Sequence, residues 1–226
     1  MTVVTYTANT LWVCPPGVTS VLVELWGGTG GPATGSSAVA GGGAGGCYAA
    51  KIVTVVPGNS YQINVAAISI ATTSTRVNGN DTTFGATLVV AKGGVGGLIA
   101  SVASGAGNGG TAITTGCVGD TVYAGGNGGN GTAAGISGGG GGGAGSSGSG
   151  NSGSLGTAGV AKTEYGGAGG NGVSTANTYN AGSMYGGGGS GGKASSSTDR
   201  KGGNGAAGFA RLTYTAAITT KIYIFD

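Results

Sequence analysis

Glycine recurs at every third position through much of this chain. Between residues 135 and 159, each third position holds glycine, alanine or serine. These positions are Gly135, Gly138, Gly141, Ala144, Ser147, Gly150, Gly153, Gly156 and Gly159. Shorter runs with the same spacing occur at 93–97, 125–131, 166–172 and 202–208. A flexible glycine-serine linker has no physical reason to keep such a phase, so the spacing favours ordered structure.

A period of three matches the polyproline-II type of helix, which has about three residues per turn and a rise of ~3.1 Å per residue. That helix has no internal hydrogen bonds, so its N–H and C=O groups point sideways and need partners when they are buried. Glycine at the contact positions lets neighbouring backbones approach, because no Cβ separates them. The spacing therefore predicts a polyglycine-II helix bundle over residues 93–208. Its structural glycines are predicted to include Gly125, Gly128, Gly131, Gly166, Gly169 and Gly172.

A flexible tract is the alternative for residues 93–208. Ordering a residue costs about 1–2 kcal/mol of backbone entropy, and glycine loses more freedom than any other residue. Dense lateral hydrogen bonding must therefore offset a large entropy loss if the tract is ordered. Collagen itself is excluded, because the chain has only four prolines and its triplets are interrupted.

Residues 1–92 carry strand patterns, in which apolar residues alternate. The pattern is clearest at 21–26, where Val21, Val23 and Leu25 occupy alternate positions and point to one face. Further strands are predicted at 3–7, 11–13, 47–56 and 61–70, with a strand or hairpin in 81–91.

These patterns predict a mainly β protein with no substantial α-helix. Residues 1–92 are expected to form an antiparallel β-sandwich-like part with a glycine-rich insertion at 27–46. Residues 93–208 would form the polyglycine-II bundle with its connecting loops. Residues 209–226 would supply a closing strand and a C-terminal assembly segment, in which Ile222 and Ile224 pair with a sheet edge of this chain or of a neighbour.

Charge is scarce, and its distribution bears on partners. Only 7% of residues are charged and the net charge is +3, with Lys193, Arg200 and Lys201 as the one close basic group. Nucleic-acid binding usually needs basic residues clustered on one face, so no nucleic-acid partner is expected. No apolar run reaches the ~18 residues of a membrane span, and residues 1–8 lack the pattern of a secretory signal.

The sequence offers little catalytic chemistry. It has no histidine, which is the commonest general base and metal ligand. The three cysteines, Cys14, Cys47 and Cys117, match no disulfide framework or zinc motif and are interpreted as small buried apolar residues. We therefore expect no enzyme activity, no cofactor and no metal.

Tyrosines lie between the glycine runs. The intervening segments, 111–123, 160–165, 173–185 and 193–201, are expected to form turns at the ends of the bundle. They carry Tyr123, Tyr165, Tyr179, Tyr185 and Arg200. Tyrosine gives a large contact area at low entropy cost. The four tyrosines, together with Arg200, are therefore candidate receptor-binding residues. The alternative is that the tyrosines cap the ends of the bundle.

Four blocks of the sequence, in this order, resemble the glycine-rich domains of bacteriophage tail-fibre and other virion proteins. The blocks are TLWVCPPGVTSVLVELWGG at 10–28, GGGAGGCYAAKIVTVVPGNSYQINV at 41–65, DTTFGATLVVAKGGVGG at 81–97 and GGNGAAGFARLTY at 202–214. The middle of the chain is also similar to the tail-tip adhesins of some T-even-like phages, in which loops between polyglycine helices touch the host receptor.

This resemblance implies a structural virion protein of a bacteriophage, placed in a tail fibre, a tail tip or a head surface attachment. Such a protein is made in the host cytoplasm and contributes to host-surface attachment. Its partners would be other virion proteins, copies of itself, and a host surface polysaccharide or outer-membrane protein. Two alternatives remain open: a self-assembling extracellular filament, suggested by the C-terminal strand, and an ice-binding protein, whose exposed small residues would need to be regular.

Overall fold

The protein is built on two antiparallel β-sheets. The computed structural model describes residues 1–32, 39–73, 75–99, 106–133, 135–162, 164–194 and 201–216, and within them the chain is mainly β with no helix. The first sheet has the strand order β1-β9-β3-β4-β8 and the second has β2-β5-β6-β7. The strands are β1 (Thr2–Tyr6), β2 (Thr10–Val13), β3 (Ser20–Trp26), β4 (Tyr48–Thr54), β5 (Ser60–Asn64), β6 (Thr82–Phe84), β7 (Val89–Ala91), β8 (Thr121–Tyr123) and β9 (Phe209–Tyr214).

One hydrophobic core joins the two sheets. The alternation of β3 places Val21, Val23 and Leu25 in this core, together with Ile63 of β5 and Phe84 of β6. All five side chains are fully buried. The predicted strand at 21–26 and its inward face are therefore confirmed.

Strand β9 lies inside the first sheet, between β1 and β3. Leu212 is opposite Val4 of β1 on one side and Val23 of β3 on the other. A segment near the end of the chain thus completes the sheet that the first residues begin, and the fold depends on contacts between distant parts of the sequence.

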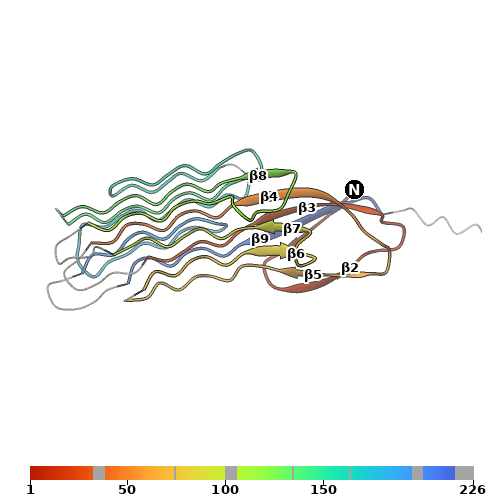
Figure 1. Ribbon diagram of the computed structural model, residues 1–226, viewed down its shortest axis with the longest axis horizontal. Helices are drawn as coiled ribbons and strands as arrows, with labels where there is room; N and C mark the ends of the chain where they lie inside the picture. The colour runs from red at the N-terminus through yellow and green to blue at the C-terminus, as the bar shows by residue number, and fades with distance from the viewer. Residues whose placement is uncertain are drawn as a thin grey trace, which may run out of the picture.

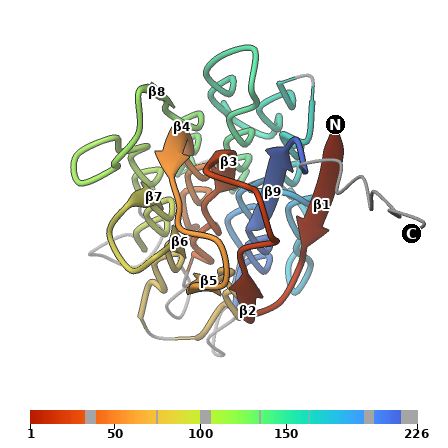
Figure 2. The same cartoon turned by 90° about the vertical axis from the view of Figure 1, so that its right-hand side faces the viewer.

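Extended segments leave the strands and run side by side toward the opposite end of the molecule (Figure 1). Figure 2 looks from the sheet end, and the same segments lie behind the strands as a compact group of coils. The described parts of these extended segments are 27–32, 39–47, 65–73, 75–81, 92–99, 106–112, 124–133, 135–145, 149–162, 166–173, 179–183, 187–194 and 201–208. We call the end of the molecule away from the sheets the far end.

The strand predicted at 61–70 is wrong beyond Asn64, where β5 ends. From there the chain changes to a period of three, with Ala66 and Ser69 buried while Ile68 and Ile70 are exposed. The carbonyls of Ala66 and Ser69 accept backbone N–H groups from Gly208 and Gly205 at 2.9 and 3.0 Å. Small side chains at these two positions allow that close approach, so the β-branched residues Ile68 and Ile70 do not produce a strand.

The other predicted strands agree with the structure to within a few residues. β1, β2 and β4 occupy the expected places, and β6 and β7 form the predicted hairpin with Thr82 opposite Ala91. Arg200, Ile222 and Ile224 lie outside the described residues. Across the described ranges, no helix is long and apolar enough to span a membrane.

Candidate functional site

The central segment, residues 40–47, bonds to three neighbouring segments in rotation. Successive residues donate their backbone N–H groups to different segments, and every third residue returns to the same one. The donors and acceptors are Ala40 to Gly192, Gly41 to Leu98, Gly42 to Gly129, Gly43 to Gly189, Ala44 to Val95, Gly45 to Gly126, Gly46 to Gly186 and Cys47 to Lys92, at 2.8–3.1 Å. Each advance of three residues moves the partner back by three, so all three neighbours run antiparallel to the central segment.

Further segments cover the remaining sides of the central segment. Its carbonyl groups accept N–H groups from residues 138–144, with Gly138 bonding to Ala40 at 3.1 Å and Gly141 to Gly43 at 2.9 Å. Gly110 likewise donates to the carbonyl of Gly42 at 2.8 Å. Residues 40–47 are therefore bonded through the backbone on several sides at once and are buried throughout.

Residues 138–144 repeat the rotation with their own neighbours. The donors and acceptors are Gly138 to Ala40, Gly139 to Ser154, Gly140 to Gly170, Gly141 to Gly43, Gly142 to Asn151, Gly143 to Gly167 and Ala144 to Gly46, at 2.8–3.1 Å. Here residues 40–46 run parallel to the donors, while the other two neighbours run antiparallel. The rotation of partners is thus shared by two segments that are nearly a hundred residues apart in the sequence.

The predicted structural glycines stand where a side chain would collide with another backbone. A Cβ would meet its nearest atom at 2.0 Å for Gly128 and Gly169, 2.1 Å for Gly172, 2.3 Å for Gly125, 2.6 Å for Gly166 and 2.8 Å for Gly131. The nearest atom belongs to a backbone in every case except Gly131, where it is Cγ1 of Val39. A real Cβ cannot approach another backbone this closely, so glycine is required at these contacts by space.

Asparagines in the glycine triplets supply acceptors that the sequence analysis did not assign. The side-chain oxygens of Asn127, Asn130 and Asn171 accept the backbone N–H groups of Ala112, Gly109 and Ala158 at 2.7, 2.8 and 2.9 Å. These asparagines are exposed, so their amides bond the outward-facing N–H groups of the adjacent segment. The recurring Gly-Gly-Asn triplet was the feature of the sequence that could have predicted these asparagine acceptors.

An open groove runs along this asparagine-bearing surface. Its volume is about 560 Å³, and its walls carry uncharged polar side chains. The polar lining residues are Thr111, Asn127, Asn130, Thr132, Ser152 and Ser154. Such a groove offers hydrogen bonds to a neutral ligand. Among the described residues, no three His, Cys, Asp or Glu side chains lie close enough to hold a metal ion.

An aromatic cluster lies where the first sheet meets the extended segments. Trp26 at the end of β3, Tyr48 at the start of β4 and Phe209 at the start of β9 form its buried centre. Their ring centroids lie 4.9 Å apart for Trp26 and Tyr48 and 5.3 Å apart for Trp26 and Phe209. These residues alternate with Leu25, Ala49 and Ala210 of the core between the sheets, so the cluster is a second apolar centre on the other face of the first sheet.

Three of the four candidate receptor-binding tyrosines pack on this aromatic cluster. Tyr185 and Tyr165 stack on Phe209 with centroid distances of 4.4 and 5.0 Å, and Tyr123 stacks on Tyr48 at 6.0 Å. Tyr165 remains 45% exposed. The structure thus brings these three tyrosines together at the sheet end of the segments.

Tyr179 lies apart from that cluster, toward the far end. It follows residues 174–178, which come after Val173. The carbonyl of Val173 accepts the N–H of Ser137 at 2.9 Å, and the next residue, Gly138, donates its N–H to Ala40. Val173 therefore lies level with the end of the central segment at Ala40. Residues 174–178 therefore lie beyond Ala40, which is the end of the central segment opposite β4. The Tyr179 side chain is 45% exposed.

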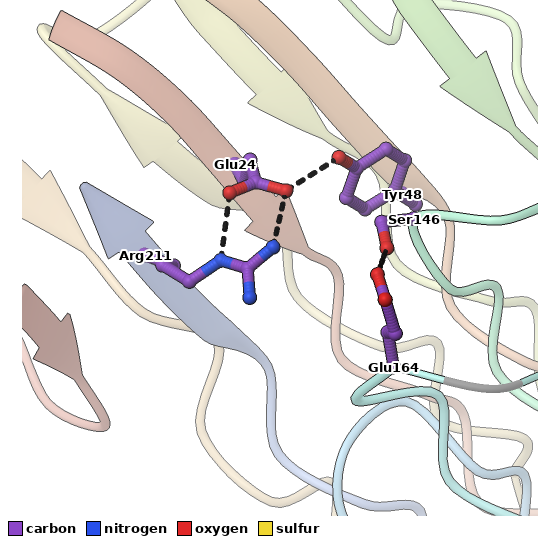
Figure 3. Close-up of polar contacts among 5 residues, drawn as sticks. All are labelled: Glu24, Tyr48, Ser146, Glu164 and Arg211. Carbon is purple, nitrogen blue, oxygen red and sulfur yellow. Dashed lines mark hydrogen bonds and ion pairs between the residues drawn. The ribbon is translucent and has the colours of Figure 1, made fainter. Parts of the chain in front are cut away.

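A partly buried ion pair links β3 and β9 in the first sheet (Figure 3). Arg211 of β9 donates two hydrogen bonds of 2.7 Å to the Glu24 carboxylate of β3, whose Oε1 also accepts the Tyr48 hydroxyl at 2.9 Å. Burial, followed by the negative charge of Glu24, raises the pKa of the Tyr48 phenol above its ordinary value. The hydrogen bond to Glu24 raises the pKa of Arg211 as well, so the guanidinium stays charged. Nearby, Ser146 and Glu164 are hydrogen-bonded to each other (Figure 3).

The comparison with known protein families covers almost the whole chain. The family model of the glycine-rich domain matches residues 4–215. The chain therefore belongs to the glycine-rich domain family. No curated protein matches it significantly.

Replacing Gly128 by alanine should destabilise the protein by about 3 kcal/mol, because the new methyl group would overpack a closed backbone contact. Gly58 is the control, since a Cβ there meets nothing within 4 Å, although its φ is +81°. Gly58→Ala should therefore cost only about 1 kcal/mol, from the left-handed conformation. Urea unfolding measures both variants, and equal losses would contradict the role of backbone contact at Gly128.

Removing one partner of the Glu24–Arg211 pair should also destabilise the protein. Glu24→Gln should lower the free energy of unfolding by about 2–3 kcal/mol, because Arg211, whose side chain is 21% exposed, loses its partner. With Arg211→Gln added, the double variant should lose at least about 1 kcal/mol less than the sum of the single variants. Strictly additive losses in thermal and urea unfolding would show that the two side chains do not stabilise each other.

Proposed function

We propose that the extended segments form a polyglycine-II bundle. The supporting observation is the rotation of partners in residues 40–47 and 138–144. A helix with about three residues per turn presents every third N–H to the same neighbour. The small contact residues Ala66 and Ser69 extend the same arrangement to a segment without glycine. The bundle is held by lateral hydrogen bonds between the backbones of neighbouring segments. These bonds take the place of the backbone hydrogen bonds within an α-helix or between the strands of a sheet.

The bundle predicts backbone geometry that NMR measures directly. Chemical shifts of residues 41–46 should report φ near −75° and ψ near +145°, the polyproline-II values. Their amide protons should exchange with solvent at rates set by global unfolding, since every one is bonded and buried. Dihedral angles of a pleated strand, or exchange as fast as in an unfolded peptide, would contradict a polyglycine-II bundle.

We propose further that the protein is a structural component of a bacteriophage virion, placed in a tail fibre, a tail tip or a head surface attachment. The resemblance of the four sequence blocks to virion proteins supports this. The elongated body, with sheets at one end and turns at the other, suits a rigid projecting part (Figure 1). Its partners would be other virion proteins and copies of itself, and the proposal assigns it no reaction.

Within this proposal, the far end is the part that contacts the host. A sheet end stiffened by the Glu24–Arg211 pair and the aromatic cluster suits attachment to the rest of the particle. The turn at 174–178 and the exposed ring of Tyr179 suit contact with a surface polysaccharide or an outer-membrane protein. Tyr123, Tyr165 and Tyr185 instead fit the alternative role, in which they cap the bundle where it meets the sheets.

Antibody labelling of phage particles tests the place of the protein. Negative-stain images should show label on the tail or head surface of each particle. Label restricted to open helical polymers would favour the filament instead, and unlabelled particles in a lysate that contains the protein would overturn the virion proposal.

Two tyrosine substitutions test the assignment of the far end. Tyr179→Ala should slow attachment of particles to host cells while changing stability by less than about 0.5 kcal/mol, as for other surface sites. Tyr185→Ala should lower stability by about 2–3 kcal/mol through loss of packing on Phe209. Normal attachment of particles that carry Tyr179→Ala would contradict a receptor-binding role for Tyr179.

A further inference from the structure

Cys47 and Cys117 lie side by side, although 70 residues separate them in the sequence. Both contact the backbone of Lys92, whose carbonyl accepts the N–H of Cys47 at 3.0 Å and whose N–H donates to Sγ of Cys117 at 3.4 Å. Interaction between the two thiols is the largest influence on the pKa of each. The fold thus brings together two free cysteines, one from the central segment and one from the loop before β8.

The two thiols differ in exposure and acidity. Cys47 is buried, whereas Cys117 is half-buried and follows a turn whose residue Gly116 is exposed. The hydrogen bond from Cys47 lowers the pKa of the Cys117 thiol, while the hydrogen bond to Cys117 and then burial raise the pKa of Cys47. The charged groups that face the pair are Lys92 and Asp81, which form an ion pair with each other. Cys117 is therefore the more reactive thiol, because thiolates are the nucleophilic form.

We propose that Cys47 and Cys117 form an intramolecular disulfide when the protein meets a small-molecule disulfide such as oxidised glutathione. The Cys117 thiolate attacks one sulfur of the oxidant, whose S–S bond breaks and releases one small thiolate. Cys47 gives its proton to this first thiolate and then attacks the Cys117 sulfur. The bond between Cys117 and the small molecule breaks and releases the second small thiolate. The second thiolate takes up the proton that Cys117 had released to solvent. Two protein thiols are oxidised, and one small disulfide is reduced to two thiols.

The disulfide would fasten the loop before β8 to the central segment. It closes a long loop of chain, and closing such a loop restricts the unfolded state. Oxidation should therefore raise Tm by about 5–10 °C. A reducing compartment keeps the thiols free, and the bond forms when the protein enters an oxidising one.

Mass spectrometry of the full-length protein tests the disulfide. The reduced protein is incubated with oxidised glutathione, and its mass should fall by about 2 Da as two hydrogens leave. A peptide map should link Cys47 to Cys117 and leave Cys14 free. Cys14 is the internal control, because it is buried with its Sγ 3.3 Å from the carbonyl of Val18. Three free thiols after incubation, or a link through Cys14, would overturn the proposal.

A variant separates the two steps of the exchange. Cys47→Ala should stop at the first step and carry one glutathione on Cys117, with no loss of 2 Da, because the resolving thiol is absent. Cys14→Ser should form the Cys47–Cys117 bond as the unmodified chain does. Because Cys47→Ala also removes the hydrogen bond that lowers the pKa of Cys117, the adduct should form more slowly at neutral pH. A Cys117 that stays unreacted in the folded variant even at alkaline pH would show that Cys117 is not the attacking thiol and would overturn the proposal.

Discussion

Contact between backbones without an intervening side chain is the interaction on which the bundle of extended segments depends. In residues 40–47 every N–H group is bonded to another segment, so the polar backbone is satisfied although the segment is buried. A Cβ at Gly42 would lie 2.1 Å from the carbonyl oxygen of Gly139. Side chains large enough to build an ordinary apolar core would therefore break the hydrogen bonds that hold these segments together. Glycine here serves for its small size and not for its flexibility.

The two sheets supply the buried apolar side-chain area that the glycine segments lack. Ordering glycine segments loses much backbone entropy, and such segments bury little apolar side-chain area. The core around Leu25, Ile63 and Phe84 provides that area between the sheets, and the separate aromatic cluster provides more at the starts of the extended segments. Because several segments, such as those that follow β5 and β7, emerge from strands that are already paired, their relative positions are set where they begin. The sheet end and the bundle are thus parts of one cooperative structure.

The local parts of the fold were predictable from the sequence, and the long-range parts were not. Alternation at Val21, Val23 and Leu25 predicts β3. The triplet spacing does not single out the glycines that need space, because Gly126 and Gly129 lie outside the predicted phase and a Cβ there would meet another backbone at 1.9 and 2.3 Å. The triplets of residues 135–159, however, continue through a reversal in which Gly145 and Gly148 bond to each other. Glycine and serine suit a turn as well as a contact, so the sequence does not locate that reversal. The proximity of Cys47 to Cys117 likewise follows only from the folded arrangement, because no local pattern links them.

Successive N–H groups of a segment bond to different neighbouring segments in turn, and this pattern limits how the bundle can change in length. If three residues are inserted in a segment of the proposed polyglycine-II bundle, each later N–H still faces the neighbour it faced before, and the segment grows by about 9 Å. A single inserted residue would turn every later N–H toward the wrong neighbour and place a side chain against a backbone. Related proteins should therefore differ in length by whole triplets within the segments, and by any number of residues in the turns. A body of this kind can be extended in steps while its cross-section stays unchanged.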